Sequence, residues 1–259
     1  MNKTNYSLNK DGFTLLPKIF STSIIDNARK ELWKVIQGEY DTGVLPENRF
    51  WNKGDDPKNI IKIDKPHLSN KTINNLICDT DFGKILAKIT KSKTIQIWHC
   101  QSVWKPFGGG LLGNAGWHRD IQYWPFWKAI GVYTAWIAFS NVTDESGPVR
   151  FISGSNNWSE IQGLDFFNKD IINQEKTINN VKKNLNIINS NLMKGEISIH
   201  TSTTYHSSGP NVSNKDRVGM VVHFCTDRAE RISIKGQNSE YLNQMEDQLI
   251  CPIIYSDNN

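Results

Sequence analysis

The sequence predicts a mainly β protein, an all-β barrel or double-sheet jelly roll preceded by helices. From Thr94 onward, apolar residues alternate with period two in short runs, and Gly- and Pro-containing turn signals separate these runs. Ahead of Thr94 the apolar spacing is helical. The 259 residues suffice for one domain with a full core. We expect a single domain over 1–259, with a helical lead-in over 1–93, the jelly-roll core over 94–235 and a lid-like insertion over 156–194.

The lead-in begins with a short strand and two helices. The turn signal Asp11-Gly12 precedes the apolar run 13–16, which predicts a strand. Ser21 to Ser23 can cap a helix that Gly38 ends, and a second helix is expected to start near Asp79. The stretch 41–66 is rich in Gly, Pro, Asn and Asp and indicates a long surface connection. The apolar residues at helical spacing are Ile25, Ala28, Leu32 and Val35 in the first helix, and Phe82, Ile85, Leu86 and Ile89 in the second.

The core is expected to contain six strands. Along the first of them, strict alternation predicts that Ile95, Ile97, His99, Gln101 and Val103 share one face. The insertion interrupts the strand pattern, is rich in Asn and Lys, and is typical of a lid or binding loop with some helix. The expected strands are Thr94–Trp104, Ile130–Phe139, Val149–Ile152, Glu196–His200, Val218–Cys225 and Ile232–Lys235.

Composition argues against several classes of protein. The formal net charge is only +4 and the basic residues are scattered, so nucleic acid is not an expected partner. The longest apolar runs are far shorter than the ~20 residues that span a bilayer, so no membrane partner is expected. The polar N-terminus lacks the apolar core of a signal peptide. The four cysteines form no Cys-x-x-Cys pair, which favours free thiols and a cytoplasmic location.

His118 and Asp120 are candidate metal ligands. In an extended segment, residues two apart point the same way, so this imidazole and this carboxylate would face one side. Alone, the pair is a weak signal. Among the six histidines, His206 has the most suggestive setting, at an expected strand end beside the turn Ser208-Gly209-Pro210. Two histidines and one carboxylate on one face form the facial triad of non-haem Fe(II) oxygenases.

Arg217 adds a fourth element, 11 residues after His206 at the start of an apolar strand. A guanidinium at this position could reach across a barrel and bind a carboxylate through two hydrogen bonds. Taken alone, it would more simply be a surface cation at a strand edge. The order of His-x-Asp, His and Arg along a jelly-roll pattern is much more specific than any one of the motifs.

This combination resembles the iron- and 2-oxoglutarate-dependent oxygenases, and among them the phytanoyl-CoA dioxygenase family. The resemblance runs from about Asp11 to about Phe224. Ser153 stands where the family has proline, and Glu196 where it has aspartate, and neither change touches the proposed chemistry. The segments that carry the resemblance are Lys105-Pro106, Gly116–Phe126, Ala135–Ala138, Glu145–Ser155, Gly195–His200 and His206–Arg217.

The resemblance implies a site residue by residue. Iron would be bound by His118, Asp120 and His206, which form the catalytic centre. Arg217 would hold the distal carboxylate of the co-substrate 2-oxoglutarate, with help from Ser208. Gln101 and Trp136 occupy positions that line the co-substrate pocket in relatives, although Gln101 could be an internally satisfied polar residue and Trp136 part of the core. His200 is also common in the family and is expected to be a supporting residue rather than a ligand.

The implied function is a dioxygenase that uses Fe(II), 2-oxoglutarate and O2 to hydroxylate an unactivated C–H bond of a small-molecule metabolite or natural-product intermediate, releasing succinate and CO2. Halogenating relatives lack the carboxylate that Asp120 supplies, so hydroxylation is favoured. The same iron chemistry could instead give desaturation, cyclisation or epimerisation. Outside this class, the residues would also suit a zinc hydrolase or a non-catalytic cupin-like binding protein.

Overall fold

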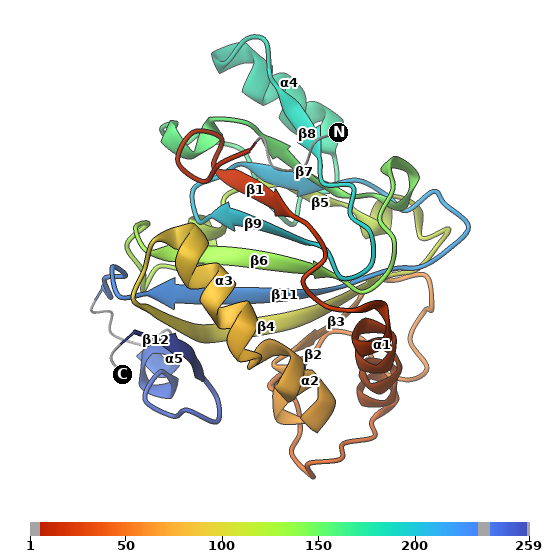
Figure 1. The fold of residues 1–259 in the computed structure, drawn as a ribbon. Coiled ribbons are helices and arrows are strands. Elements are labelled where there is room, and N and C mark those ends of the chain that lie inside the picture. Colours follow the sequence, from red (N-terminus) through yellow and green to blue (C-terminus); the bar gives the residue numbers. More distant parts are fainter. Residues whose placement is uncertain (1–5, 233–238, 258–259) are drawn as a thin grey trace.

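Two antiparallel sheets form the core of the computed structural model, which describes residues 6–232 and 239–257 (Figure 1). This is the double-stranded β-helix, or jelly roll, that the sequence predicted. The large sheet has the order β1 (Phe13–Leu16), β9 (Ile197–Thr201), β6 (Val132–Ala138), β11 (Arg217–Thr226), β4 (Thr94–Lys105), β3 (Ile61–Asp64) and β2 (Asn48–Arg49), and β12 (Ile253–Ser256) also pairs with β4. The small sheet has the order β5 (Ala115–His118), β10 (His206–Ser208), β7 (Val149–Ile152) and β8 (Ile187–Asn189).

Helices α1 (Thr22–Gln37), α2 (Lys71–Ile77) and α3 (Thr80–Thr90) lie on one face of the large sheet (Figure 1). The predicted ends of two of them are confirmed. Ser21 caps α1, and Gly38 ends it with a φ of 90°, a left-handed conformation that glycine adopts readily. Asp79 caps α3 by accepting a hydrogen bond of 2.8 Å from the backbone N–H of Phe82.

The face predicted for the first core strand is wrong because β4 contains a bulge at Trp98. His223 of β11 pairs with His99, but the next residue, Phe224, pairs with Ile97. The extra residue reverses the alternation of β4 at that point. Ile95 and Ile97 therefore pack in the core beneath the helices. Beyond the bulge, Gln101, Val103 and Lys105 point the other way and line a cavity between the sheets.

The expected surface connection over 41–66 is also corrected, since it contributes the last two strands of the large sheet, β3 and β2. Ile61 and Ile63 of β3 are buried beneath the helices, and burying these apolar side chains favours pairing of β3 with β4. The large sheet thus draws strands from the lead-in and, through β12, from beyond residue 235. Of the last expected strand, Ile232–Lys235, residues 233–235 lie outside the described residues.

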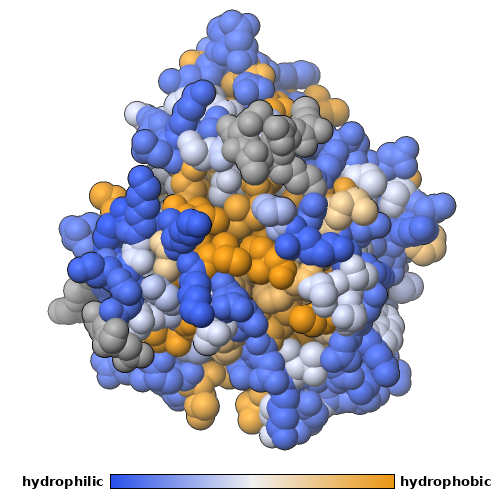
Figure 2. Space-filling model, viewed as in Figure 1, coloured by the Kyte–Doolittle hydropathy of each residue, from blue (hydrophilic) through white to orange (hydrophobic). Residues whose placement is uncertain are grey.

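The insertion contains helix α4 (Ile171–Val181) and strand β8, which extends the small sheet. A further helix, α5 (Ser239–Gln244), precedes β12. Figure 2 shows that hydrophilic side chains cover most of the face that carries α1 and α3, while apolar ones show in the gap between these helices. Within the described ranges, no helix has the length and apolar character needed to span a bilayer.

Candidate metal and co-substrate site

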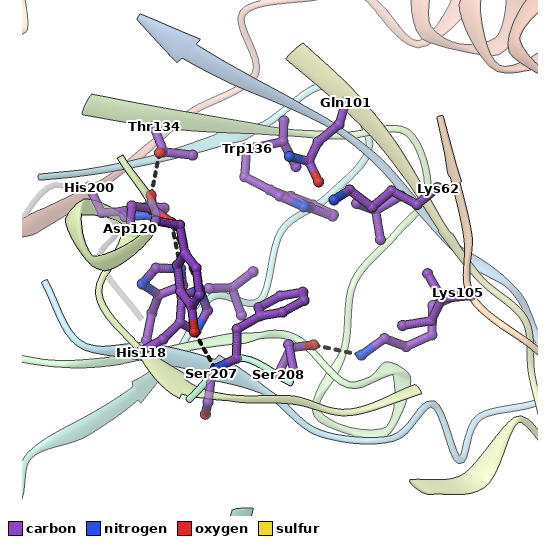
Figure 3. A pocket seen from close by; sticks show the side chains of 18 of the residues that line it. Lys62, Gln101, Lys105, His118, Asp120, Thr134, Trp136, His200, Ser207 and Ser208 are labelled. Carbon is purple, nitrogen blue, oxygen red and sulfur yellow. Dashed lines mark hydrogen bonds and ion pairs between the residues drawn. The ribbon is translucent and has the colours of Figure 1, made fainter. Parts of the chain in front are cut away.

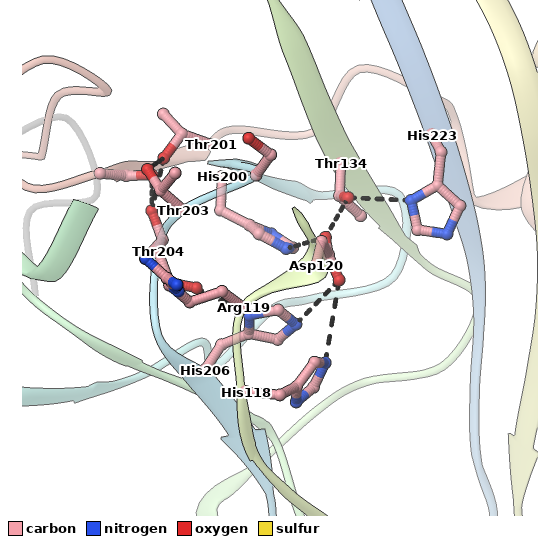
Figure 4. A network of polar contacts seen from close by, with 12 residues as sticks. His118, Arg119, Asp120, Thr134, His200, Thr201, Thr203, Thr204, His206 and His223 are labelled. Atoms are coloured by element: carbon pink, nitrogen blue, oxygen red, sulfur yellow. Dashed lines mark hydrogen bonds and ion pairs between the residues drawn. The ribbon is translucent and has the colours of Figure 1, made fainter. Parts of the chain in front are cut away.

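Three predicted ligands meet at one end of the small sheet. His118 ends β5, Asp120 follows it at the start of a short 3-10 helix, and His206 opens β10, directly opposite His118 in the sheet register. Oδ1 of Asp120 lies 3.8 Å from Nε2 of His118 and 3.5 Å from Nε2 of His206 (Figure 4). One ligand atom from each residue lies within 4.8 Å of the other two, a spacing that suits a metal ion. The turn Ser202–Tyr205 separates His206 from β9, so His206 begins a new strand instead of extending the preceding one.

Backbone carbonyls fix the tautomers of both histidines. Nδ1 of His118 lies 2.7 Å from the carbonyl oxygen of Gly116, and Nδ1 of His206 lies 3.0 Å from that of Thr204. A carbonyl only accepts, so each Nδ1 carries the hydrogen. Burial lowers the pKa of both imidazoles, which favours the neutral form. Each Nε2 therefore presents a lone pair toward Asp120, as a metal ligand must.

The two oxygens of Asp120 have different tasks. Oδ2 accepts hydrogen bonds from the Thr134 hydroxyl at 2.5 Å and from Nε2 of His200 at 3.0 Å, and Oδ1 faces the two histidines (Figure 4). Burial alone would raise the pKa of Asp120, but the hydrogen bond from His200 opposes this effect, and the pKa lies well below its ordinary value. Because Nε2 of His200 donates to this carboxylate, His200 supports a ligand.

A chain of hydrogen bonds continues from Asp120 into the large sheet. Burial lowers the pKa of His223 to about 3, so its neutral ring carries one hydrogen. Thr134 donates its hydroxyl hydrogen to Asp120, so its oxygen can only accept from His223. Nδ1 of His223 therefore carries the hydrogen and donates it to the Thr134 oxygen at 2.9 Å. Nε2 of His223 then accepts from the Gln101 amide at 3.2 Å, which leaves the amide oxygen of Gln101 free to accept. Neither Thr134 nor His223 was predicted, although His223 lies an even number of residues from Arg217 on β11 and therefore on the same face.

Arg217 opens β11 on the opposite side of the cavity. It is 3% exposed, and its Nη1 donates to the carbonyl of Gly147 at 2.7 Å and to Oγ of Ser208 at 3.3 Å. Its guanidinium lies 5.1 Å from the ring centroid of Trp136, a cation–π distance. Burial lowers the pKa of Arg217 to about 10, so it remains charged at neutral pH. All four predicted co-substrate residues, Arg217, Ser208, Gln101 and Trp136, line the same cavity as the three ligands.

This cavity has a volume of about 280 Å³ and lies between the two sheets (Figure 3). The large sheet supplies Gln101, Trp136 and Arg217, and the small sheet supplies His118 and His206. Several other residues that line the cavity had no predicted role, namely Lys62, Lys105, Thr134, Phe166, Phe167 and His223. They come from segments far apart in the chain, so only the fold shows that they share a cavity.

The insertion closes one side of the cavity. The backbone N–H of Gly116 donates to the carbonyl of Phe166 at 2.9 Å, which joins the insertion to the first ligand strand. The Tyr123 hydroxyl donates to Asp165 at 2.6 Å and accepts from the N–H of Phe166 at 2.8 Å. The Phe166 ring stands edge-on to the imidazole of His118, with centroids 5.0 Å apart. An aromatic wall from the insertion therefore lies directly beside a candidate ligand.

The donor set fits iron. Two neutral imidazole nitrogens and one carboxylate oxygen converge on one point, and the rest of the cavity is open beside them. The model of one protein family, described as phytanoyl-CoA dioxygenase (PhyH), matches residues 8–219. The chain belongs to this family. It is therefore an iron- and 2-oxoglutarate-dependent enzyme, and the predicted class and cofactors are confirmed.

Solved structures of low sequence identity share the fold. The 2-oxoglutarate-dependent carbocyclase SnoK from nogalamycin biosynthesis is 15% identical with a TM-score of 0.69, covering 92% of this chain and 94% of its own. The epimerase SnoN, solved with Fe3+, α-ketoglutarate and nogalamycin RO, is 15% identical (TM-score 0.65; 87% and 83% covered). EctD from S. alaskensis, solved with bound Fe, is 16% identical (TM-score 0.65; 85% and 74% covered). A search of curated proteins by sequence gave no match.

Proposed function

We propose that this enzyme hydroxylates an unactivated C–H bond of a small molecule, with iron held by His118, Asp120 and His206. The observation that carries the proposal is the convergence of two Nε2 lone pairs and Oδ1 of Asp120 on the cavity that Arg217 also lines. Iron bound there would activate O2 together with 2-oxoglutarate, yielding succinate and CO2. The carboxylate of Asp120 occupies the position that halogenating relatives leave to a halide, which supports hydroxylation.

Residues of the large sheet would orient the co-substrate. In this proposal, Arg217 binds the distal carboxylate of 2-oxoglutarate, and Trp136 stacks beneath the guanidinium and keeps its direction fixed. Ser208, the last residue of β10 in the small sheet, contacts Arg217 and adds a hydroxyl at the same end of the cavity. Gln101 directs its free amide oxygen into the cavity, where it can accept a hydrogen bond from a bound molecule.

The remaining space would receive the substrate. The cavity of about 280 Å³ is slightly smaller than the ~300–1,000 Å³ of typical ligand sites, which favours a small substrate. Phe166 and Phe167 of the insertion border it together with Tyr123, and this supports a lid role for 156–194 that excludes water from the site. The four described cysteines are unpaired, which supports a reducing compartment such as the cytoplasm.

The test is a screen for succinate release with Fe(II) and 2-oxoglutarate across amino acids, acyl carriers and CoA thioesters, phosphonates and amines. We expect one class to stimulate succinate release and to gain one oxygen atom. Asp120→Ala and Arg217→Ala should each abolish the stimulation, whereas Asp81→Ala, a change at an exposed helix residue, should not. Unchanged turnover in both site variants would overturn the assignment.

Product mass also separates the other candidate reactions. Loss of two hydrogens would indicate desaturation or ring closure, and an unchanged mass with inverted stereochemistry would indicate epimerisation. These outcomes are included because structures of similar fold include a carbocyclase and an epimerase. A product formed without O2 would indicate a hydrolase, and the absence of any succinate with every class would indicate a binding protein.

A further inference from the structure

Lys105 is a buried cation without an acidic partner. It ends β4, is 2% exposed, and its Nζ donates to Oγ of Ser208 and to the carbonyl of Gly209, both at 2.6 Å (Figure 3). Within residues 6–232 and 239–257, no carboxylate forms an ion pair with it. A buried charge is costly unless it is paired, so an ammonium group at this position needs an anion.

Arg217 is a second buried cation without an anionic partner, and it contacts the same Ser208. Its Nη1 also contacts Oγ of Ser208, its Nε is buried without a hydrogen-bond partner, and no described carboxylate pairs with it. The single hydrogen of Ser208 points to the carbonyl of Gly147 at 3.0 Å, so its oxygen accepts from both cations. One neutral hydroxyl therefore stands between two buried cations that both line the cavity.

We propose that Lys105 is a second cation of the co-substrate site and binds the distal carboxylate of 2-oxoglutarate together with Arg217. This inference rests on the proposed function. A carboxylate has two oxygens, and one oxygen can accept from the guanidinium while the other accepts from the ammonium. The third hydrogen of the Lys105 ammonium is not used by Ser208 or Gly209 and is available for this contact.

The surroundings of Lys105 make its protonation depend on whether a carboxylate is bound beside it. Burial, and the positive charges of Arg217 and of Lys169 in the insertion, lower the pKa of Lys105 well below its ordinary value. An arriving carboxylate reverses this repulsion and favours the ammonium form.

The decisive experiment measures binding of two ligands to the protein loaded with Zn(II), where turnover plays no part. 2-Oxobutyrate keeps the 2-oxo acid end of 2-oxoglutarate and lacks the distal carboxylate. We expect Lys105→Met to weaken 2-oxoglutarate ~10- to 100-fold, as for the loss of a hydrogen bond between charged groups, and to leave 2-oxobutyrate within about twofold. Lys105→Arg, which keeps the positive charge, should retain more affinity for 2-oxoglutarate than Lys105→Met.

A purely structural lysine would behave differently. If Lys105 served only to hold the Ser208-Gly209 turn, Lys105→Met would lower the thermal stability of the ligand-free protein and weaken both ligands alike. In our proposal the ligand-free variant is at least as stable as the parent, because an unpaired buried charge has been removed. Unchanged 2-oxoglutarate affinity in Lys105→Met with a large loss in Arg217→Met would overturn the role of Lys105 alone. No loss in either variant would contradict the co-substrate site of the proposed function.

Discussion

The hydroxyl of Thr134 donates to Oδ2 of Asp120 at 2.5 Å, and with His200 of β9 it connects the candidate metal ligand to the large sheet. Thr134→Val keeps the shape of the side chain but removes the donor to Asp120 and the acceptor for His223. Hydrogen bonds that orient a ligand typically change metal affinity ~10- to 100-fold. We expect a loss of this size, measured by Co(II) or Fe(II) titration of the metal-free protein.

Thr134→Ser is the matched control, because it keeps the hydroxyl and should stay close to the parent. His200→Gln removes the imidazole that donates to the same Oδ2. Since both donors hold one oxygen, the effects of Thr134→Val and His200→Gln should not add in the double variant. Purely additive losses would show that Thr134 and His200 act on Asp120 independently of each other.

Local sequence rules were sufficient for both ends of α1, for the start of α3 and for most core strands. Ser21, Gly38 and Asp79 act through neighbours within a few residues, so the chain itself signals them. The face of β4 was misjudged because the bulge at Trp98 depends on how β11 pairs with it, and pairing partners are distant in the sequence. The two-residue spacing of His118 and Asp120 indicated a metal site locally. The position of Lys105 in the co-substrate site is visible only from its contact with Ser208, 103 residues later.

Gly219 lies against the face of Trp136, so a methyl group there should disturb the co-substrate site. A Cβ at this position would lie 2.1 Å from Cζ2 of the indole. Gly219→Ala must displace Trp136, which then no longer stacks on Arg217. We expect ~10-fold weaker 2-oxoglutarate binding from loss of the cation–π contact and of the fixed guanidinium. Calorimetry of the Zn(II)-loaded variant would measure this.

Trp136→Phe in the Gly219→Ala background provides the control. The smaller ring makes room for the added methyl group, so the double variant should be more stable than Gly219→Ala alone. Metal affinity without 2-oxoglutarate should be close to that of the parent in both variants, because neither residue contacts the ligands. Parent-like 2-oxoglutarate affinity in Gly219→Ala would refute the positioning role of Trp136.

Gly116 allows the insertion to lie directly on the first ligand strand. A Cβ here would lie 2.1 Å from the carbonyl oxygen of Asp165 and 2.5 Å from that of Asn168. Gly116→Ala should therefore separate the segment 165–168 from β5 and speed limited proteolysis within 156–194. Phe167→Ala alters a mostly exposed side chain of the same segment and should leave the cleavage rate near that of the parent. Equal cleavage of Gly116→Ala and the parent would show that the insertion is held elsewhere.

Two buried neutral histidines predict how acid destabilises the metal-free protein. Burial lowers the pKa of His67 to about 4 and that of His223 to about 3, against ~6.5 in an unfolded chain. Between these values the unfolded chain binds protons that the folded protein does not. Stability should therefore fall as the pH drops below ~6.5, by up to ~1.4 kcal/mol per pH unit for each histidine.

Urea unfolding between about pH 7 and about pH 5 measures this slope. His67 separates the effect from the metal site, because its Nε2 contacts the carbonyl of Ile250 and its Nδ1 contacts Cys100. His67→Gln keeps a donor for the Ile250 carbonyl and cannot titrate. The free energy of unfolding of this variant should depend less steeply on pH than that of the parent, because one histidine no longer takes up a proton on unfolding. An equally steep slope would mean that His67 is already protonated in the folded protein or is neutral in both states.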